Sequence, residues 1–66
     1  MSSFTKDYKE ISHNPAAGMP ILRARKAELA RIEHEGRATK NGFRRQCLAQ
    51  EWQRLKAEYD QLDALI

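Results

Sequence analysis

The sequence predicts an all-α protein: a short helix followed by an antiparallel helical hairpin. Near the end of the chain, apolar residues recur at spacings of four and three, the spacing of a heptad seam along one helical face. No alternating apolar and polar run is present and the chain has no valine, so no strand is expected. Glycine and proline are confined to residues 13–20 and 36–42, which separate three helical patterns within one small domain, residues 1–66.

The first pattern predicts a short amphipathic helix within residues 1–12. Phe4, Tyr8 and Ile11 follow one another at four and three residues and so share one face. Ser2 or Ser3 is suited to cap the start of this helix. A helix of about ten residues is marginal by itself, so this face must dock on another surface.

The second predicted helix covers residues 20–35 and follows a connector at residues 13–19. Two prolines and a glycine within residues 13–20 interrupt any helix, and Pro20 suits the first helical position. The seam of this helix is Leu22, Leu29 and Ile32, with Arg25 at the heptad position between the two leucines.

The third predicted helix covers residues 43–66, after a turn at residues 36–42 that contains two glycines. The register of the second helix does not continue across this turn, which favours two helices over one. The apolar seam of the third helix consists of Leu48, Trp52, Leu55, Tyr59, Leu62 and Ile66.

Charge distribution favours antiparallel pairing of the two longer helices, about 20–35 and 43–66. Residues 23–45 carry eight basic and three acidic side chains, whereas residues 46–66 carry two basic and four acidic ones. The second helix begins with basic residues and the third ends with acidic ones. Both arrangements are unfavourable, because a helix dipole favours acidic residues at the start and basic residues at the end. Folding back at residues 39–40 offsets this cost. The expected neighbours are Glu28 with Arg54, Arg23 and Lys26 with Glu58, and Glu35 with Arg45.

The small size of the chain favours a homodimer that forms a helical bundle. A 66-residue chain buries only about 60% of its unfolded surface, and a single cysteine gives no internal disulfide. The second predicted helix is also shorter than the third, which leaves the end of the third uncovered. The expected dimer or partner interface consists of Phe4, Tyr8, Ile11, Trp52, Tyr59, Leu62, Leu65 and Ile66. The alternatives are a monomer, and a first helix that docks on its own hairpin.

No motif for catalysis, metal binding or a cofactor is present, so we expect no enzyme and no small-molecule substrate. Cys47 has no activating base nearby in sequence and is expected to be an inert, buried or half-buried thiol. The expected function is that of a non-enzymatic regulatory or accessory protein that binds itself and another protein through its helices. The expected fold is similar to that of small dimeric helical-hairpin regulators, and the chain as a whole is similar to accessory proteins of phages and plasmids.

The alternative function is that of a small RNA- or DNA-binding regulator. No acidic residue occurs from Gly36 to Gln50, and the region combines cations with an aromatic ring that can stack on a base. The residues concerned are Arg37, Lys40, Phe43, Arg44 and Arg45. The competing interpretation is an ordinary solvated turn.

The expected location is the cytoplasm, without membrane association. An unpaired cysteine is typical of a reducing compartment. The N-terminal residues show no signal-peptide pattern, and no apolar run approaches the length of a membrane span.

Overall fold

The computed structural model describes residues 3–66, and within them the prediction of an all-α protein is confirmed. Three α-helices and one short 3-10 helix are present, and no strand occurs in this range. The elements are α1 (Ser3–His13), the 3-10 helix η1 (Pro15–Ala17), α2 (Gly18–Ala38) and α3 (Gly42–Asp63).

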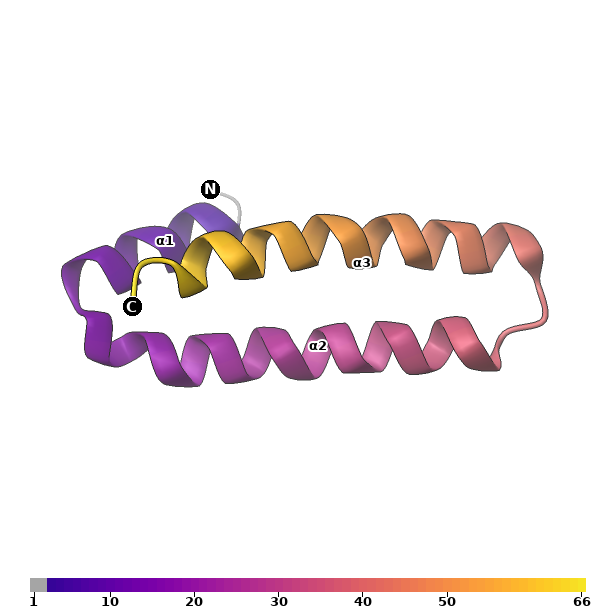
Figure 1. Cartoon of the computed structure of the whole chain (residues 1–66), viewed down its shortest axis with the longest axis horizontal. Helices are drawn as coiled ribbons and strands as arrows, with labels where there is room; N and C mark the ends of the chain where they lie inside the picture. The colour runs from indigo at the N-terminus through magenta and orange to yellow at the C-terminus, as the bar shows by residue number, and fades with distance from the viewer. Residues whose placement is uncertain (1–2) are drawn as a thin grey trace.

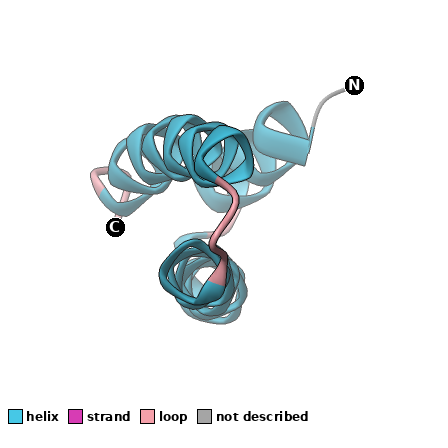
Figure 2. Ribbon diagram, turned by 90° about the vertical axis from the view of Figure 1, so that its right-hand side faces the viewer, coloured by secondary structure: helices cyan, strands magenta, loops and turns pink. Residues whose placement is uncertain are grey.

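The two long helices lie side by side and run in opposite directions, and their contact is the most extensive in the chain (Figure 1). The short helix α1 packs on both of them near the start of α2 and the end of α3. Viewed along the long axis, α1 lies to one side of the α2–α3 pair (Figure 2). The shape is therefore elongated, 42 × 19 × 17 Å.

The core is concentrated at the end where all three helices meet. Ile11, Leu22 and Leu62 form one buried cluster, with one residue from each helix. The half-buried residues around it are Phe4, Ile21, Tyr59 and Leu65. Farther along the α2–α3 pair the buried residues are Leu29, Ile32 and Leu48. Burying apolar side chains at both ends of the pair holds the two helices together along their length.

The connector is more helical than the sequence predicts. Pro15 begins η1, and α2 starts at Gly18 instead of Pro20. Pro20 is the third residue of α2, where a missing N–H costs no helical hydrogen bond. A Cβ atom on the buried Gly18 would lie 2.5 Å from Ile66 Cδ1, so the absence of a side chain allows this close approach. The first helix ends at His13. Of its two predicted caps, Ser3 is the first residue of α1 and Ser2 lies outside the described residues.

The turn is shorter than the predicted range of 36–42. Helix α2 continues through Gly36 to Ala38, and only Thr39, Lys40 and Asn41 connect it to α3. The cost of a glycine in a helix, about 1 kcal/mol, is offset by the packing of α2 on α3. Asn41 is the N-cap of α3: its side chain accepts hydrogen bonds from the backbone N–H groups of Phe43 and Arg44.

The predicted difference in helix length is wrong, because α2 has 21 residues and α3 has 22. The end of α3 is covered within the chain by Ile11 of α1 and Leu22 of α2, and Leu62 is 0% exposed. Helix α3 ends at Asp63, and a short turn follows it instead of helix to residue 66.

The ion pairs between helices differ in their partners from those predicted. Arg25 is the α2 residue that reaches Glu58, at 3.3 Å, and Glu35 lies 3.5 Å from Arg44 instead of Arg45. Glu28 pairs with Arg31 on its own helix, not with Arg54. Within residues 3–66, no helix combines the length and the apolar character needed to cross a bilayer.

Candidate protein-interaction face

The face of the α2–α3 pair that α1 leaves open carries a continuous groove, which we call the Trp52 groove. Three adjoining hollows form it. The middle hollow shares Glu33 and Trp52 with the hollow nearer the turn. It shares Lys26 and Tyr59 with the hollow nearer the start of α2. The lining residues are Met19, Leu22, Arg23, Lys26, Leu29, Ala30, Ile32, Glu33, Gly36 and Arg37 from α2, and Arg45, Leu48, Ala49, Trp52, Gln53, Lys56, Tyr59 and Asp63 from α3. The hollow beside α1, which Ser3 and Asp7 help to line, shares none of these residues.

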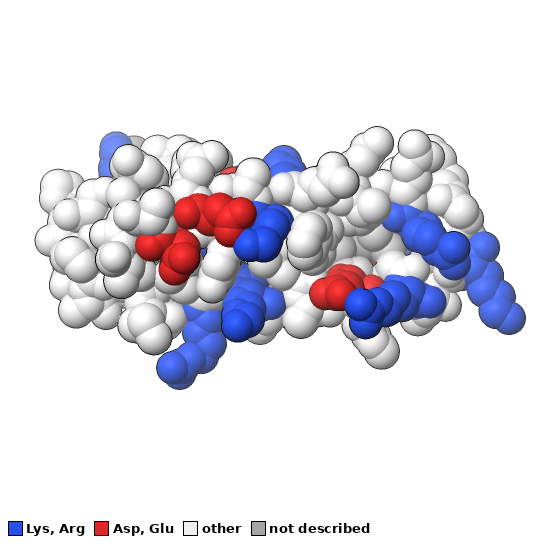
Figure 3. Space-filling model, in the orientation of Figure 1, with Lys and Arg blue, Asp and Glu red and all other residues white. Residues whose placement is uncertain are grey.

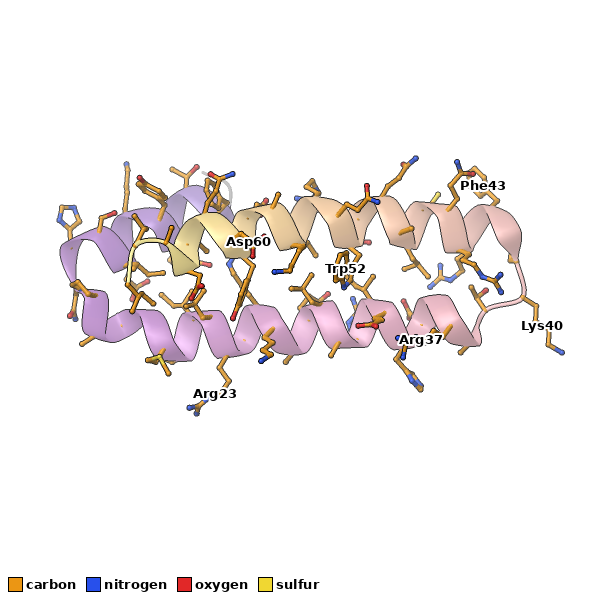
Figure 4. The ribbon with its side chains drawn as sticks, in the orientation of Figure 1. Arg23, Arg37, Lys40, Phe43, Trp52 and Asp60 are labelled. Atoms are coloured by element: carbon orange, nitrogen blue, oxygen red, sulfur yellow. The ribbon has the colours of Figure 1, made fainter. Side chains whose placement is uncertain are left out.

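Trp52 occupies the middle of the groove, between the ribbons of α2 and α3 (Figure 4). Its side chain is half-buried, and its indole Nε1 is buried without a hydrogen-bond partner. A buried N–H without a partner costs free energy. Trp52 is therefore covered by the chain on one side and open to the groove on the other.

The rims of the groove carry charges of both signs (Figure 3). Glu33 accepts a hydrogen bond from Arg37 at 2.6 Å, and Lys56 donates one to Asp60 at 2.6 Å. The hydrogen bond to Asp60 raises the pKa of Lys56 above its usual value. The ammonium group of Lys56 also lies 5.3 Å from the centre of the Tyr59 ring, within the range of a cation–π contact. Lys26 and Arg23 have no hydrogen bond or ion pair within the described chain.

The predicted interface residues separate into buried and open groups. Ile11 and Leu62 are fully buried within the chain, so their side chains present no surface to a partner. Phe4 and Leu65 are half-buried against the same core, and the rings of Phe4 and Tyr8 lie 5.9 Å apart. Tyr8 and Ile66 are exposed, and the half-buried Trp52 and Tyr59 line the groove. Ile66 and Tyr8 lie outside the groove.

The turn end of the molecule brings together the residues predicted to contact nucleic acid. Phe43 is 77% exposed, and both it and Lys40 point away from the α2–α3 interface (Figure 4). Two of the four cations are partly neutralised, because Arg37 pairs with Glu33 and Arg44 lies 3.5 Å from Glu35. Arg45 donates a hydrogen bond to the backbone carbonyl of Thr39 at 2.7 Å.

Cys47 is exposed on α3, which corrects the expectation of a buried or half-buried thiol. It lies beside the apolar seam at a position that faces solvent in the α2–α3 pair. Among residues 3–66, no group of three or more His, Cys, Asp or Glu side chains is placed to hold a metal ion.

Sequence patterns alone did not single out Lys26, Glu33 and Arg45 as rim residues of one groove. The available signal was their heptad spacing: Lys26 and Glu33 are seven residues apart, as are Arg45 and Trp52. No known protein family, curated protein or solved structure compared with this chain matches it.

Proposed function

We propose that this protein is a small non-enzymatic regulatory or accessory protein that acts through contacts between helical faces. In this proposal α2 and α3 form an antiparallel hairpin, and the hairpin works as a homodimer. The observation that carries the proposal is the Trp52 groove, an apolar channel that runs along an uncovered helical face with a half-open tryptophan at its centre. Large aromatic side chains in open apolar grooves are the usual anchors of protein interfaces.

The surface area of the chain supports the same proposal. The chain exposes 4904 Å², whereas a compact protein of its mass, 7.7 kDa, exposes about 4,300 Å². The excess arises because two long helices form one layer, and α1 covers only part of one side of it. A second helical surface placed over the open side would bury apolar area that now contacts water.

The test is the molar mass in solution, measured by sedimentation equilibrium from low to high micromolar concentration. A mass that rises to that of a dimer is the expected result. Trp52 is the only tryptophan, so its fluorescence should shift to shorter wavelength over the same range as water leaves the groove. A mass that stays monomeric at high micromolar concentration would exclude the homodimer.

A matched pair of variants locates the interface. Ala30 is exposed in the groove, whereas Ala57 is exposed on α3 outside it. Ala30→Glu should weaken self-association at least tenfold, because it places a charge in an apolar contact. Ala57→Glu adds the same charge and should leave association unchanged. Equal effects of the two substitutions would place the interface elsewhere.

The exposure of Phe43 beside Lys40 favours a second candidate function, binding of single-stranded RNA or DNA at the turn end. Cations contact phosphates, and an exposed ring can stack on a base. The expected result is a mobility shift at low salt that is lost when Arg44→Glu and Arg45→Glu are combined. A shift that persists in this variant would exclude the turn end as the nucleic-acid site.

A further inference from the structure

The groove carries opposite charges at equal distances on either side of its centre. On the α2 rim, Lys26 and Glu33 lie one heptad apart, and both are exposed. On the α3 rim, Arg45 precedes Trp52 by seven residues, and Asp60, which accepts a hydrogen bond from the groove-lining Lys56, follows it by eight. At 1.5 Å per residue, these two charges lie about 10 and 12 Å from the level of Trp52.

The centres of the two charge pairs lie at the same level of the α2–α3 pair. Two contacts between the helices define the levels: Arg25 with Glu58, and Glu35 with Arg44. Halfway between these contacts lie residue 30 on α2 and residue 51 on α3. The midpoint of Lys26 and Glu33 is therefore level with Trp52, within about one residue. These two pairs of opposite charges are thus antisymmetric about a single point of the groove, whereas Arg23 and Arg37 on the α2 rim carry like charges.

From this pattern, and resting on the homodimer of the proposed function, we infer that two copies pack groove to groove in antiparallel orientation. The two-fold axis lies in the interface at the level of Trp52, perpendicular to the helices. It places α2 over α2 and α3 over α3 of the second copy. A rotation of this kind exchanges the two ends of the groove and places the same face of both copies in contact, as an isologous interface requires.

Each opposite charge then meets its complement. Lys26 faces Glu33 of the second copy, and Arg45 faces Asp60 of the second copy, with each contact made twice. The two Trp52 rings meet at the axis, where each covers the open side of the other. Such charge pairs contribute little affinity singly, but they determine the orientation of the two copies.

The other two-fold arrangement, with the axis along the groove, places α2 over α3 of the second copy. At equal levels it brings Arg37 close to Arg45 and Lys26 close to Lys56, which are like-charged contacts. The perpendicular axis brings Arg23 to the level of Arg37, and both side chains point away from the α2–α3 interface (Figure 4). Its other like-charged neighbours, Arg45 and Lys56, differ in level by about three residues. Electrostatic repulsion therefore favours the perpendicular axis.

The dimensions of the face agree with a stable dimer. Figure 1 views the chain down its shortest axis, so the face it presents measures 42 by 19 Å. A rectangle of these dimensions has an area of about 800 Å², which is comparable to the accessible surface that each partner buries in an interface of standard size. The antiparallel arrangement also places the two basic turns at opposite ends of the dimer.

A charge exchange between two chains tests the orientation. Lys26→Glu and Glu33→Lys each create two like-charged contacts in a homodimer, and each should weaken dimerisation about tenfold at low salt. Mixing the two variants creates two attractive contacts in the heterodimer. The mixture should therefore dimerise about as tightly as the unmodified chain. Dissociation constants are measured by sedimentation equilibrium, and helix content by circular dichroism.

Two further variants complete the design. A single chain with both Lys26→Glu and Glu33→Lys should regain the affinity of the unmodified homodimer. Lys9 is an exposed lysine on α1, outside the groove. Lys9→Glu makes the same change of charge as Lys26→Glu and should leave the affinity unchanged.

The outcomes separate the two proposals. Recovery in the mixture and in the double variant supports the antiparallel orientation. A dimer in the unmodified chain without recovery in either case overturns this orientation and leaves the proposed homodimer in place. A chain that stays monomeric throughout overturns both.

Discussion

Arg25 of α2 donates a hydrogen bond from Nε to Oδ2 of Asp7 in α1, at 2.9 Å, although 18 positions separate the two residues. The same guanidinium group reaches Glu58 of α3 at 3.3 Å and the hydroxyl of Ser3 at 3.2 Å. The Arg25 side chain is only 12% exposed, so these partners replace much of its hydration. One charged side chain on the apolar seam of α2 thus connects all three helices.

Arg25→Ala should destabilise the protein by about 1–3 kcal/mol, because it leaves the half-buried Asp7 carboxylate without its cation and Glu58 with Arg54 alone. The loss should be greatest for α1, which has few other contacts. Urea unfolding measures the free energy, and amide hydrogen exchange locates the loss. Arg25→Lys keeps the charge but cannot reach both carboxylates in the same geometry, so it should recover only part of the stability. Uniform loss of exchange protection in all three helices would argue against a specific role in docking α1.

The packing of Trp52 and its unpaired N–H make opposite contributions to stability. Trp52→Phe removes the unpartnered N–H and keeps most of the ring contact, so the free energy of unfolding should change by less than about 1 kcal/mol. Trp52→Ala removes the ring and should cost about 2–4 kcal/mol. Thermal unfolding at fixed protein concentration compares the two. Equal losses for both variants would mean that the indole N–H has a partner in solution.

Asn41→Ala should cost about 1 kcal/mol, because α3 loses the side chain that accepts from two of its first backbone N–H groups. Asn41→Asp keeps an acceptor at the same position and should retain most of the stability. Chemical denaturation measures both variants. A loss with Asn41→Asp as large as that with Asn41→Ala would show that the cap hydrogen bonds do not stabilise α3.

The hydrogen bond from Arg31 lowers the pKa of Glu28 below its ordinary value of 4.5. A carboxyl whose pKa is lowered by folding stabilises the folded state above its unfolded pKa. This contribution is lost as the pH falls through the folded pKa. NMR titration of the Glu28 carboxyl carbon measures the shift, and Arg31→Gln should return the pKa toward 4.5. An unchanged titration in Arg31→Gln would assign the shift to another group.

The helical class and much of the core followed from periodicity. Leu22, Leu29, Ile32, Leu48 and Leu62 lie on the predicted seams, and all are buried. The boundaries were less accurate, because Gly36 was interpreted as part of a turn and Pro20 as the first residue of its helix. Gly36 lies within α2, and Pro20 lies in its first turn, where proline is tolerated. The Asn41–Gly42 pair, typical of a turn, instead caps and begins α3.

The candidate site was predicted only in part. Trp52 and Tyr59 were expected at an interface, and both line the groove. Leu62 and Ile11 were expected there too, yet each covers the other in the core. Their burial depends on the docking of α1 against α2 and α3, which residue spacing left open between the chain itself and a second copy.

The sequence by itself determined that the chain is helical, which residues share a helical face, and how charge divides between its parts. These properties depend on residue spacing, which is visible in one dimension. Only the tertiary structure decided which apolar residues the chain covers for itself, which carboxylates Arg25 contacts, and which face α1 leaves open. These properties depend on how far α2 is shifted along α3. That shift is determined by small differences in packing and capping free energy, contributed by residues far apart in the chain.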